Sequence, residues 1–267
     1  CGIKDYFAKM KFRNAVLGLS GGIDSAVTLV LSVRALGEEN VRVLLMPSQY
    51  SSDHSVNDAV KLAENLGVHY EIIPIREIFN TYLKELKPVF EDLPPDIAEE
   101  NIQARVRGTL LMAISNKFGN LLLNTSNKSE VAVGYGTLYG DMNGGISVLG
   151  DVYKTDVYRL ANFMNRESEV IHFNTITKPP SAELRPDQKD SDSLPDYDLL
   201  DEILFNYIEL KKSQEEIIAM GLDENQVSKA IRLVNMNEYK RFQTPPILRV
   251  SSKAFGFGRR MPLVAKY

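Results

Sequence analysis

The sequence predicts an α/β fold, an open parallel sheet with helices on both faces, followed by a helical C-terminal portion. In the first half of the chain, short apolar runs rich in Val, Leu and Ile alternate with longer segments of helical periodicity. Strands separated by helices pair in parallel, and both faces of such a sheet are covered. From residue 198 onward the pattern is helical and ends in an extended tail, which predicts the C-terminal portion.

Strand and helix signals follow one another in a regular order. The short apolar runs are predicted as strands, at residues 15–19, 41–46, 69–75 and 121–124. Helical patterns with capping residues or glycine stops lie between them, at residues 26–36, 53–66, 76–86 and 98–118. Because ligands of open parallel sheets bind at the carboxyl ends of the strands, the polar residues that follow these ends are candidates for a site.

The second half of the chain has a different character. Residues 178–197 form a polar, acidic segment that is punctuated by prolines, after which helical patterns run from 197 to 242. A stretch of about twenty residues without regular structure inside a compact domain is usually either a functional lid or disordered. We expect a mobile active-site loop at 178–197, and a helical portion with an extended tail at 198–267. Both belong to one domain that comprises residues 1–267.

Composition restricts the class of protein. The 267 residues are 44% hydrophobic and 25% charged, which is typical of a globular chain. A net charge of −4 does not suggest a broad nucleic-acid-binding surface. No apolar run approaches the ~20 residues that span a bilayer, and no signal peptide is apparent. The single cysteine, Cys1, excludes an internal disulfide and a Cys-based zinc site. We expect a cytoplasmic enzyme with neither a nucleic-acid nor a membrane partner.

The most informative segment is Ser20-Gly21-Gly22-Ile23-Asp24-Ser25, between the first expected strand and the first expected helix. Two adjacent glycines allow a tight turn and let backbone N–H groups approach an anion closely. The N-terminus of the following helix adds the positive end of its dipole, and two serine hydroxyls add donors. These features predict a phosphate-binding loop, with Asp24 placed to hold a divalent cation against the phosphates.

Two other kinds of nucleotide-binding loop are excluded. The pattern GxxxxGK[ST] is absent because no lysine precedes the final serine, so kinase-like or GTPase-like chemistry is not implied. The dinucleotide pattern GxGxxG is absent as well. A glycine-rich turn without a ligand is the remaining alternative, and the combination of glycines, hydroxyls and position argues against it.

Glu130 is the candidate partner of Asp24. It follows the strand predicted at 121–124, so its carboxylate and that of Asp24 can converge at one edge of the sheet. Mg²⁺ typically binds one or two carboxylates together with substrate phosphates, and it needs no further protein ligands. Taken alone, Glu130 is also compatible with an exposed helix position.

The helix predicted at 98–118 carries a second candidate group. Asn101 and Arg105 are one helical turn apart on one face, whereas Arg107 lies on another face. An Asn and an Arg on a single face suit a ligand with phosphate and hydroxyl groups. An ordinary charged helix face is an equally good interpretation of the local pattern.

Motifs along the whole chain resemble one enzyme family. The pattern Ser-Gly-Gly-X-Asp-Ser resembles the pyrophosphate-binding loop of the N-type ATP pyrophosphatases. Later motifs, in their order, resemble NAD synthetase, and the last two look like the synthetase domain of its glutamine-dependent forms. They are Asn-X-X-Ala-Arg-X-Arg (101–107), Asn-Thr-Ser-Asn-Lys-Ser-Glu (124–130), Gly-Asp-X-Tyr-Lys-Thr (150–155), Lys-Pro-Pro-Ser-Ala-Glu-Leu-Arg-Pro (178–186), Asp-Ser-Leu-Pro-Asp-Tyr (192–197), Pro-Pro-Ile-Leu-Arg-Val (245–250) and Gly-Arg-Arg-Met-Pro-Leu-Val-Ala-Lys-Tyr (258–267). The resemblance implies an adenine nucleotide α-hydrolase-like fold.

The resemblance also implies roles for the residues that match these motifs. ATP would bind to the loop and to three later positions: Gly18, Leu19, Ser20, Gly21, Gly22, Ile23, Asp24, Ser25, Thr125, Lys154 and Ser181. Deamido-NAD (nicotinate adenine dinucleotide) would bind to Asn101, Arg105, Glu130 and Lys240. Mg²⁺ would bind to Asp24 and Glu130, and these two carboxylates together with Lys154 are the expected catalytic residues.

The implied reaction is the ATP-dependent amidation of deamido-NAD by ammonia. It would proceed through an acyl-adenylate and release AMP and pyrophosphate, which gives NAD. Two alternatives remain at this point. One is another ATP pyrophosphatase of the same fold, such as a GMP synthetase-like enzyme, and the other is a module that binds ATP without turnover.

The resemblance implies partners as well. Family members are homodimers with the dinucleotide near the dimer interface, and an N-terminal glutaminase domain supplies ammonia in the glutamine-dependent members. The chain begins at Cys1 without such a domain, so we expect it to use free ammonia or ammonia from a domain that it lacks. One contact does not transfer, because the short ammonia-dependent enzymes carry lysine where this chain has Leu138.

Overall fold

The computed structural model describes residues 1–91, 93–186 and 188–263. Its centre is a five-stranded sheet in the order β3-β2-β1-β4-β5, in which every pairing is parallel. Asp187 of the predicted loop and residues 264–267 of the last motif lie outside the described residues. The strands are β1 (Ala15–Gly18), β2 (Val41–Leu45), β3 (His69–Ile72), β4 (Leu121–Asn124) and β5 (Ile146–Ser147).

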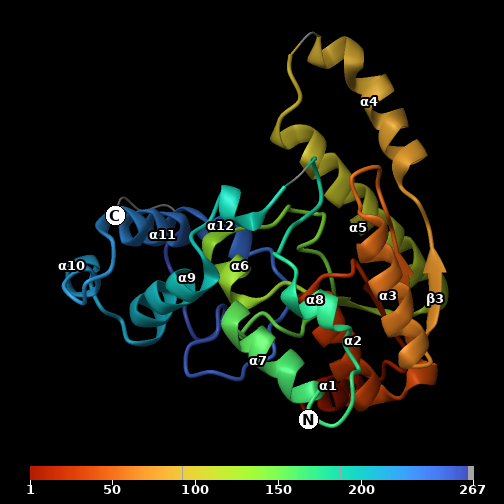
Figure 1. The fold of residues 1–267 in the computed structure, drawn as a ribbon, viewed down its shortest axis with the longest axis horizontal. Helices are drawn as coiled ribbons and strands as arrows, with labels where there is room; N and C mark the ends of the chain where they lie inside the picture. The colour runs from red at the N-terminus through yellow and green to blue at the C-terminus, as the bar shows by residue number, and fades with distance from the viewer. Residues whose placement is uncertain (92, 187, 264–267) are drawn as a thin grey trace.

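Helices surround this sheet and form the C-terminal part of the molecule (Figure 1). They are α1 (Gly2–Met10), α2 (Ile23–Leu36), α3 (Asp53–Asn65), α4 (Arg76–Phe90), α5 (Ile97–Phe118), α6 (Lys128–Val133), α7 (Lys154–Met164), α8 (Phe173–Thr177), α9 (Tyr197–Leu204), α10 (Gln214–Ile218), α11 (Glu224–Met236) and α12 (Glu238–Arg241). Short helical turns occupy 38–40 and 190–192, and a π-helical turn at 205–209 continues α9. None of the described helices is both long enough and apolar enough to cross a bilayer.

Successive residues of β1 face opposite sides of the sheet. Ala15 and Leu17 are fully buried in the larger core, which α1, α2, α3 and α7 complete. Val16 belongs to a smaller cluster on the other face, where Leu111 and Ile114 of α5 cover it. Burial on both sides explains why these strands are short apolar runs, and it confirms the predicted fold class.

The C-terminal helices have a hydrophobic core of their own. Val131 and Val133 of α6 share one buried cluster with Leu200 of α9 and with Val227 and Val234 of α11. Figure 1 shows α9, α10, α11 and α12 together on the left of the molecule, beside α6. The helical C-terminal portion therefore packs against the segment that follows β4.

The segment predicted as extended near the C-terminus adds to the edge of the sheet. Ser147 of β5 forms a parallel bridge with Ile247. Its backbone N–H donates to the carbonyl of Pro246 at 2.8 Å, and its carbonyl accepts from the N–H of Leu248 at 3.1 Å. Residues 246–248 thus cover an edge of the sheet that β5 would otherwise expose.

Several boundaries differ from those that the sequence predicts. The third strand ends at Ile72 rather than at residue 75, and α4 continues to Phe90 although Pro88 lies in its last turn. Pro88 has no N–H to bond the carbonyl of residue 84, and the helix ends two residues later. The last part of the helical pattern that was predicted up to residue 242 is divided at Asn237, whose side chain donates to the carbonyl of Val133 at 2.9 Å. Five elements were not predicted from the sequence: the helices α1, α6, α7 and α8 and the strand β5.

Candidate active site

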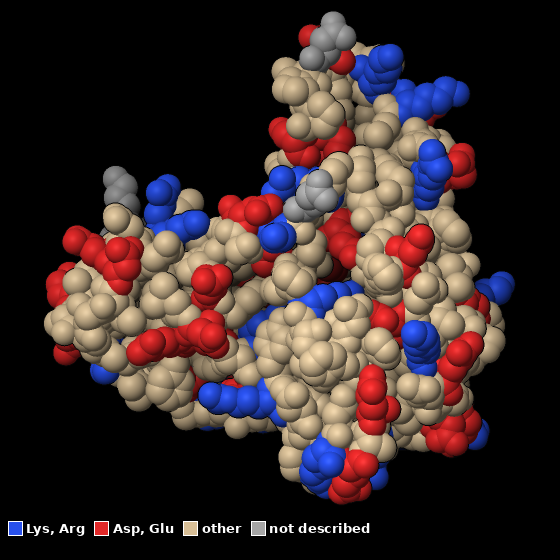
Figure 2. Space-filling view, viewed as in Figure 1, with Lys and Arg blue, Asp and Glu red and all other residues tan. Residues whose placement is uncertain are grey.

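A cleft of about 310 Å³ opens at the carboxyl ends of the central strands. Much of its lining comes from residues 18–20, 22–25, 44–47, 123–126 and 178–184. The ranges up to residue 126 follow or end β1, β2 and β4, so the cleft lies where ligands of open parallel sheets bind. Figure 2 shows the surface hollowed between the projection formed by α4 and α5 and the C-terminal helices, with acidic and basic side chains interspersed around it.

The glycine-rich loop forms one wall of this cleft. The N–H of Gly22 donates to Ser20 Oγ at 3.2 Å, and Ser25 Oγ donates to the carbonyl of Gly22 at 2.9 Å. Gly22 is also the N-cap residue of α2, and no described side chain caps this helix. The first N–H groups of α2 are therefore available to an anion, as the phosphate-binding prediction requires.

Gly21 allows this loop to pass close to α3. Its φ of +80° lies in the left-handed region, and a Cβ at this position would be 2.2 Å from the backbone oxygen of Ser55. A side chain of any size is thus excluded both by conformation and by space. Gly21 shapes the loop, whereas the other predicted ATP-binding residues all line the cleft: Gly18, Leu19, Ser20, Gly22, Ile23, Asp24, Ser25, Thr125, Lys154 and Ser181.

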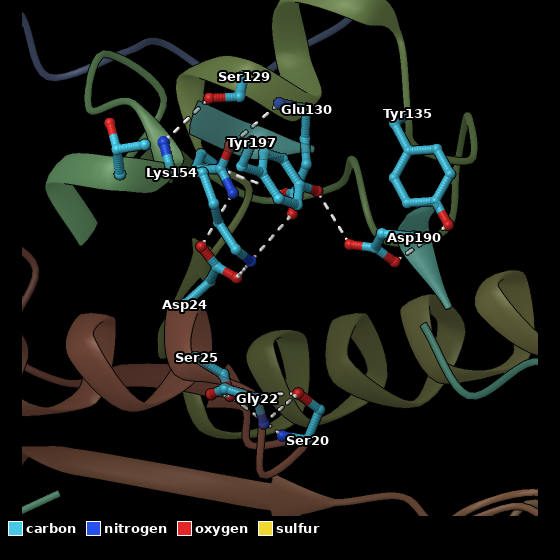
Figure 3. Close-up of polar contacts among 12 residues, drawn as sticks. Ser20, Gly22, Asp24, Ser25, Ser129, Glu130, Tyr135, Lys154, Asp190 and Tyr197 are labelled. Atoms are coloured by element: carbon cyan, nitrogen blue, oxygen red, sulfur yellow. Dashed lines mark hydrogen bonds and ion pairs between the residues drawn. The ribbon is translucent and has the colours of Figure 1, made fainter. Parts of the chain in front are cut away.

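Asp24, Glu130 and Lys154 meet in this cleft (Figure 3). Lys154 Nζ donates to Asp24 Oδ2 at 2.5 Å and lies 3.7 Å from Glu130 Oε1. The side chain of Lys154 is 3% exposed, and those of the two acids are each 17% exposed. The structure therefore places all three predicted catalytic residues together, and it removes the interpretation of Glu130 as an exposed helix residue.

The charges of Asp24, Glu130 and Lys154 shift the protonation equilibria of Glu130 and Lys154. Burial raises the pKa of Glu130 to about 8, with a further contribution from the nearby negative charge of Asp24. Burial by itself lowers the pKa of Lys154, but the carboxylates of Asp24 and Glu130 outweigh it, and this pKa lies above its ordinary value. Two acids held this close repel each other, and the ammonium of Lys154 balances them.

Asn127 links the two acids, and the sequence did not single it out. As the N-cap of α6, its side chain accepts from the N–H of Glu130 at 3.0 Å, while Glu130 Oε2 accepts from the N–H of Asn127 at 3.3 Å. Its Nδ2 also donates to Asp24 Oδ1 at 2.9 Å. The signal was available, because Asn-X-X-Glu is a capping-box pattern that begins a helix.

The segment 178–197 lies over the cleft. Lys178 Nζ donates to Ser55 Oγ at 2.9 Å, and Ser55 Oγ donates to Glu183 at 2.6 Å, so this end is joined to the start of α3. Ser181 lines the cleft, and its Oγ donates to the carbonyl of Gln188 at 2.6 Å. The predicted loop thus contributes directly to the site, while its mobility stays a prediction.

The far end of the same segment is anchored beside Lys154. Asp190 is buried and accepts from the hydroxyls of Tyr197 at 2.9 Å and Tyr135 at 3.2 Å. The ring of Tyr197 lies 5.2 Å from Lys154 Nζ, which is a cation–π contact. The two tyrosines were not among the predicted site residues, since an isolated tyrosine carries no local signal of such a role.

The other predicted dinucleotide-binding residues gather elsewhere, along the loop 134–138. Asn101 Oδ1 accepts from the hydroxyl of Thr137 at 2.7 Å, and Arg105 Nε donates to the carbonyl of Leu138 at 3.2 Å. Lys240 Nζ donates to the carbonyls of Gly134 and Gly136, both at 2.8 Å. The structure therefore brings these three residues to one loop, but it does not place them in the lining of the cleft.

Arg107, and not Arg105, is the arginine of α5 that lines the cleft. Its Nε donates to the carbonyl of Met46, at the end of β2, at 3.0 Å. Burial lowers the pKa of its guanidinium to about 10, and the nearby Asp141 opposes this shift. The sequence named Arg105 as the candidate but did not show which of the two arginines contacts a ligand, because that depends on how α5 is rotated against the sheet.

A metal ion at this site would need phosphate oxygens of a bound nucleotide, and water, in addition to protein side chains. Among residues 1–91, 93–186 and 188–263 there is no group of three or more His, Cys, Asp or Glu side chains arranged to hold a metal ion. The two carboxylates of Asp24 and Glu130 nevertheless suit Mg²⁺ that is completed by phosphate oxygens and water. Their mutual repulsion, relieved here by Lys154, is what a cation would also relieve.

Known proteins resemble this chain over most of its length. The family model for NAD synthase matches residues 1–244. The glutamine-dependent NAD(+) synthetase of Synechocystis sp. is 54% identical over 266 residues, which are 100% of this chain and 48% of that protein. This chain spans about half the length of the curated relatives that it matches.

Solved structures agree with this assignment. The glutamine-dependent NAD+ synthetase of Acinetobacter baumannii, solved in complex with ADP, is 49% identical with a TM-score of 0.65, and the match covers 97% of this chain and 47% of that one. The NH3-dependent NAD synthetase of Campylobacter jejuni is 32% identical with a TM-score of 0.72, and the match covers 92% and 94% of the two chains. Because the family model matches residues 1–244 of the 267, this chain belongs to the NAD synthase family.

Proposed function

We propose that this chain catalyses the ATP-dependent amidation of deamido-NAD to NAD. The observation that carries the proposal is the convergence of Asp24, Glu130 and Lys154 beside the glycine-rich loop, in a chain of the NAD synthase family. A phosphate-binding loop alone would fit a module that only holds ATP. Two acids and a lysine at the mouth of that loop are the groups that a reaction at the phosphates requires.

ATP would lie with its phosphates on the loop. The uncapped N–H groups of α2 and the hydroxyls of Ser20 and Ser25 support this position. Thr125, after β4, and Ser181, in the segment 178–197, line the same cleft. The Acinetobacter baumannii relative was solved with ADP, which is consistent with an adenine nucleotide in this fold.

Mg²⁺ would be held by Asp24 and Glu130 together with phosphate oxygens of ATP. When bound, the cation would neutralise phosphate charge and so make the α-phosphorus easier to attack. The fit rests on two carboxylates that approach a single ammonium, 2.5 Å and 3.7 Å from Lys154 Nζ. Lys154 would then turn from neutralising the acids to neutralising the phosphates.

The chemistry that these residues support has two steps. A carboxylate oxygen of the nicotinate group of deamido-NAD attacks the α-phosphorus of ATP. The bond between this phosphorus and the oxygen that bridges to the β-phosphorus breaks, pyrophosphate departs, and an acyl-adenylate is formed. Ammonia then attacks the activated carbonyl carbon, loses a proton, and releases AMP as the amide forms. Lys154 and the N–H groups of the loop would offset the charge that develops on the phosphates. Positioning and electrostatics suffice for such transfers, so we propose no covalent bond between protein and substrate.

Deamido-NAD would reach the cleft from the side of the loop 134–138. The contacts of Asn101, Arg105 and Lys240 with this loop support one shared surface for the dinucleotide. Glu130, which lines the cleft, would lie where the two ligands meet. We further propose that two copies of the chain form a homodimer close to this surface, which sedimentation analysis of the purified protein would test.

The nitrogen donor would be ammonia at the site itself. The Synechocystis relative is glutamine-dependent and about twice as long as the region that this chain matches, whereas the Campylobacter relative is NH3-dependent and similar in length. We propose that the synthetase chemistry of this chain accepts free ammonia, and that any use of glutamine requires a further protein domain.

The test is incubation of the chain with ATP, Mg²⁺, ammonium chloride and deamido-NAD, followed by measurement of NAD and pyrophosphate. Equal amounts of both products, abolished in Asp24→Asn, support the proposal. Pyrophosphate without NAD would identify a different acceptor and favour a related ATP pyrophosphatase. Neither product, with ATP binding retained, would favour a nucleotide-binding module. Glutamine in place of ammonium separates the two nitrogen sources.

A further inference from the structure

The N-terminus of α7 is capped from outside its own segment. Lys154 is the first residue of this helix, and the N-cap residue, Tyr153, makes no side-chain cap. Instead, the N–H of Lys154 donates to Ser129 Oγ at 2.9 Å, and the N–H of Thr155 donates to Asp201 Oδ2 at 2.9 Å. Two residues from different helices thus satisfy donors that every helix start leaves free.

Ser129 and Asp201 act as one unit. The hydroxyl of Ser129 donates to Asp201 Oδ1, so a continuous chain of hydrogen bonds runs from the carboxylate through the hydroxyl to the N–H of Lys154. Ser129 is fully buried and Asp201 is 6% exposed. Hydrogen bonds with little access to water are strong and are costly to break one at a time.

This chain of hydrogen bonds joins the two helices that carry the site. Ser129 immediately precedes Glu130 on α6, and its oxygen bonds the first residue of α7, which is Lys154 (Figure 3). Asp201 lies on α9, four residues after Tyr197, so the two residues share one face of that helix. This face of α9 is linked to both the backbone and the side chain of Lys154. Asp201 accepts from Ser129, which in turn accepts from the N–H of Lys154, and the ring of Tyr197 lies 5.2 Å from Lys154 Nζ.

We propose that Asp201 is a positioning residue for Lys154 and Glu130 in the amidation proposed above, on which this inference rests. Asp201 is not among the residues that line the cleft, and its side-chain hydrogen bonds go to Ser129 and to the N–H of Thr155, so it acts through Ser129 and the start of α7. Its removal leaves Ser129 Oγ and the N–H of Thr155 without their acceptor. The hydroxyl of Ser129 can then reorient, which weakens its bond to the N–H of Lys154 and loosens the start of α7. A displacement of about 1 Å at reacting groups lowers a rate by on the order of 100-fold.

The test compares four variants of the whole chain: Asp201→Ala, Asp201→Asn, Ser129→Ala and the double variant Asp201→Ala/Ser129→Ala. Ile203→Ala is the matched control, because Ile203 is a fully buried neighbour on α9 that belongs to the hydrophobic cluster and not to this chain of hydrogen bonds. NAD synthesis gives kcat and the KM for ATP. Amide hydrogen exchange at Lys154 and Thr155 reports the start of α7 independently of any activity.

We expect kcat to fall about 100-fold in Asp201→Ala with little change in KM, and about 10-fold or less in Asp201→Asn, which keeps one acceptor oxygen. The double variant should lose no more than the worse single variant, because the two residues act as a unit. Exchange at Lys154 and Thr155 should accelerate in Asp201→Ala beyond the change in Ile203→Ala.

Two results would overturn the inference. One is unchanged protection of these two amides in Asp201→Ala, and the other is a fall in kcat no larger than that of Ile203→Ala at equal loss of thermal stability. A wild-type chain that makes no NAD would reject the proposed function instead. The exchange measurement would then still decide, by itself, whether Asp201 holds the start of α7.

Discussion

Lys154 Nζ and Asp24 Oδ2 are joined by a hydrogen bond of 2.5 Å although 130 positions separate the two residues in the chain. Asp24 lies in the first turn of α2, after β1 and the glycine-rich loop, and Lys154 is the first residue of α7, after β5. The same ammonium balances Glu130 at 3.7 Å. The ammonium of Lys154 therefore contacts both of the acids that we propose as ligands of Mg²⁺.

Replacement of this lysine should strengthen metal binding while it abolishes synthesis. In Lys154→Met the two acids lose their balancing charge, so we expect at least a tenfold gain in affinity of the ATP-free protein for Mn²⁺, roughly what one unit charge contributes near a protein surface. NAD formation should fall by on the order of 100-fold or more, since charge on the phosphates is no longer offset. Titration with Mn²⁺ followed by EPR measures the first effect.

Lys229→Met is the control for that titration, because Lys229 lies exposed on α11. Its Mn²⁺ affinity and its rate of NAD formation should match those of the wild type. Equal or weaker Mn²⁺ binding by Lys154→Met would show that the two acids do not form a cation site.

Gly21→Ala should disrupt the phosphate loop. The new Cβ would lie 2.2 Å from the backbone oxygen of Ser55, so either the loop or the start of α3 must move. Gly221→Ala is a matched control, because Gly221 also has a positive φ, of +93°, but has open space at its Cβ. The control should lose about 1–2 kcal/mol of stability from backbone strain alone. Gly21→Ala should lose more and should also bind ATP at least tenfold more weakly, as measured by calorimetry.

The two arginines of α5 should separate the two substrates. Arg107 lines the cleft at the end of β2, whereas Arg105 bonds the loop 134–138. We expect Arg107→Met to raise the KM for ATP about tenfold with little effect on deamido-NAD, and Arg105→Met to show the reverse, since each loses a charge-assisted contact. Steady-state kinetics with one substrate varied at a time will measure both, and equal effects of the two variants on ATP would contradict the assignment.

Lys128 should stabilise the folded chain at neutral pH, and this contribution to the free energy of unfolding should be lost at acidic pH. Its fully buried Nζ donates to Asp151 at 2.8 Å and also bonds Glu209. Burial is the largest single influence and raises the pKa of both acids, but the hydrogen bonds from Lys128 and from neighbouring serines together outweigh it, and both pKa values lie below their ordinary range. Because these folded-state pKa values are depressed, the stabilisation is present above the unfolded values near ~4 and is lost as pH falls through the folded ones.

The corresponding measurement is the difference in melting temperature between the wild type and Lys128→Met across pH. At pH 7 the variant keeps two buried acids without a cation and should be less stable by about 3–5 kcal/mol. The difference should shrink as the acids become protonated below pH ~4. A difference in melting temperature that does not vary with pH would assign the loss to packing. The control Lys229→Met should melt at the same temperature as the wild type both at pH 7 and below pH ~4.

Much of the fold could be predicted because it is encoded locally. The runs that became β1, β2 and β4 are apolar on both faces, and only a parallel sheet covered on both sides buries them all. The loop from Ser20 to Ser25 was equally readable, since glycines between a strand and a helix have few other uses. The short elements α6 and β5 escaped prediction, because six residues and two residues carry too little periodicity to detect.

By itself, then, the sequence determined the sheet, the phosphate loop and, through its motifs, the family to which the chain belongs. Only the tertiary structure decided which charges meet: that Lys154 bonds Asp24, that Arg107 rather than Arg105 lines the cleft, and that Asp201 caps α7 through Ser129. The physical reason is that periodicity and turn chemistry act over a few residues. The partner of a lysine or an aspartate is set instead by strand order, which makes β1 and β4 neighbours and brings the helices that follow them to one edge of the sheet.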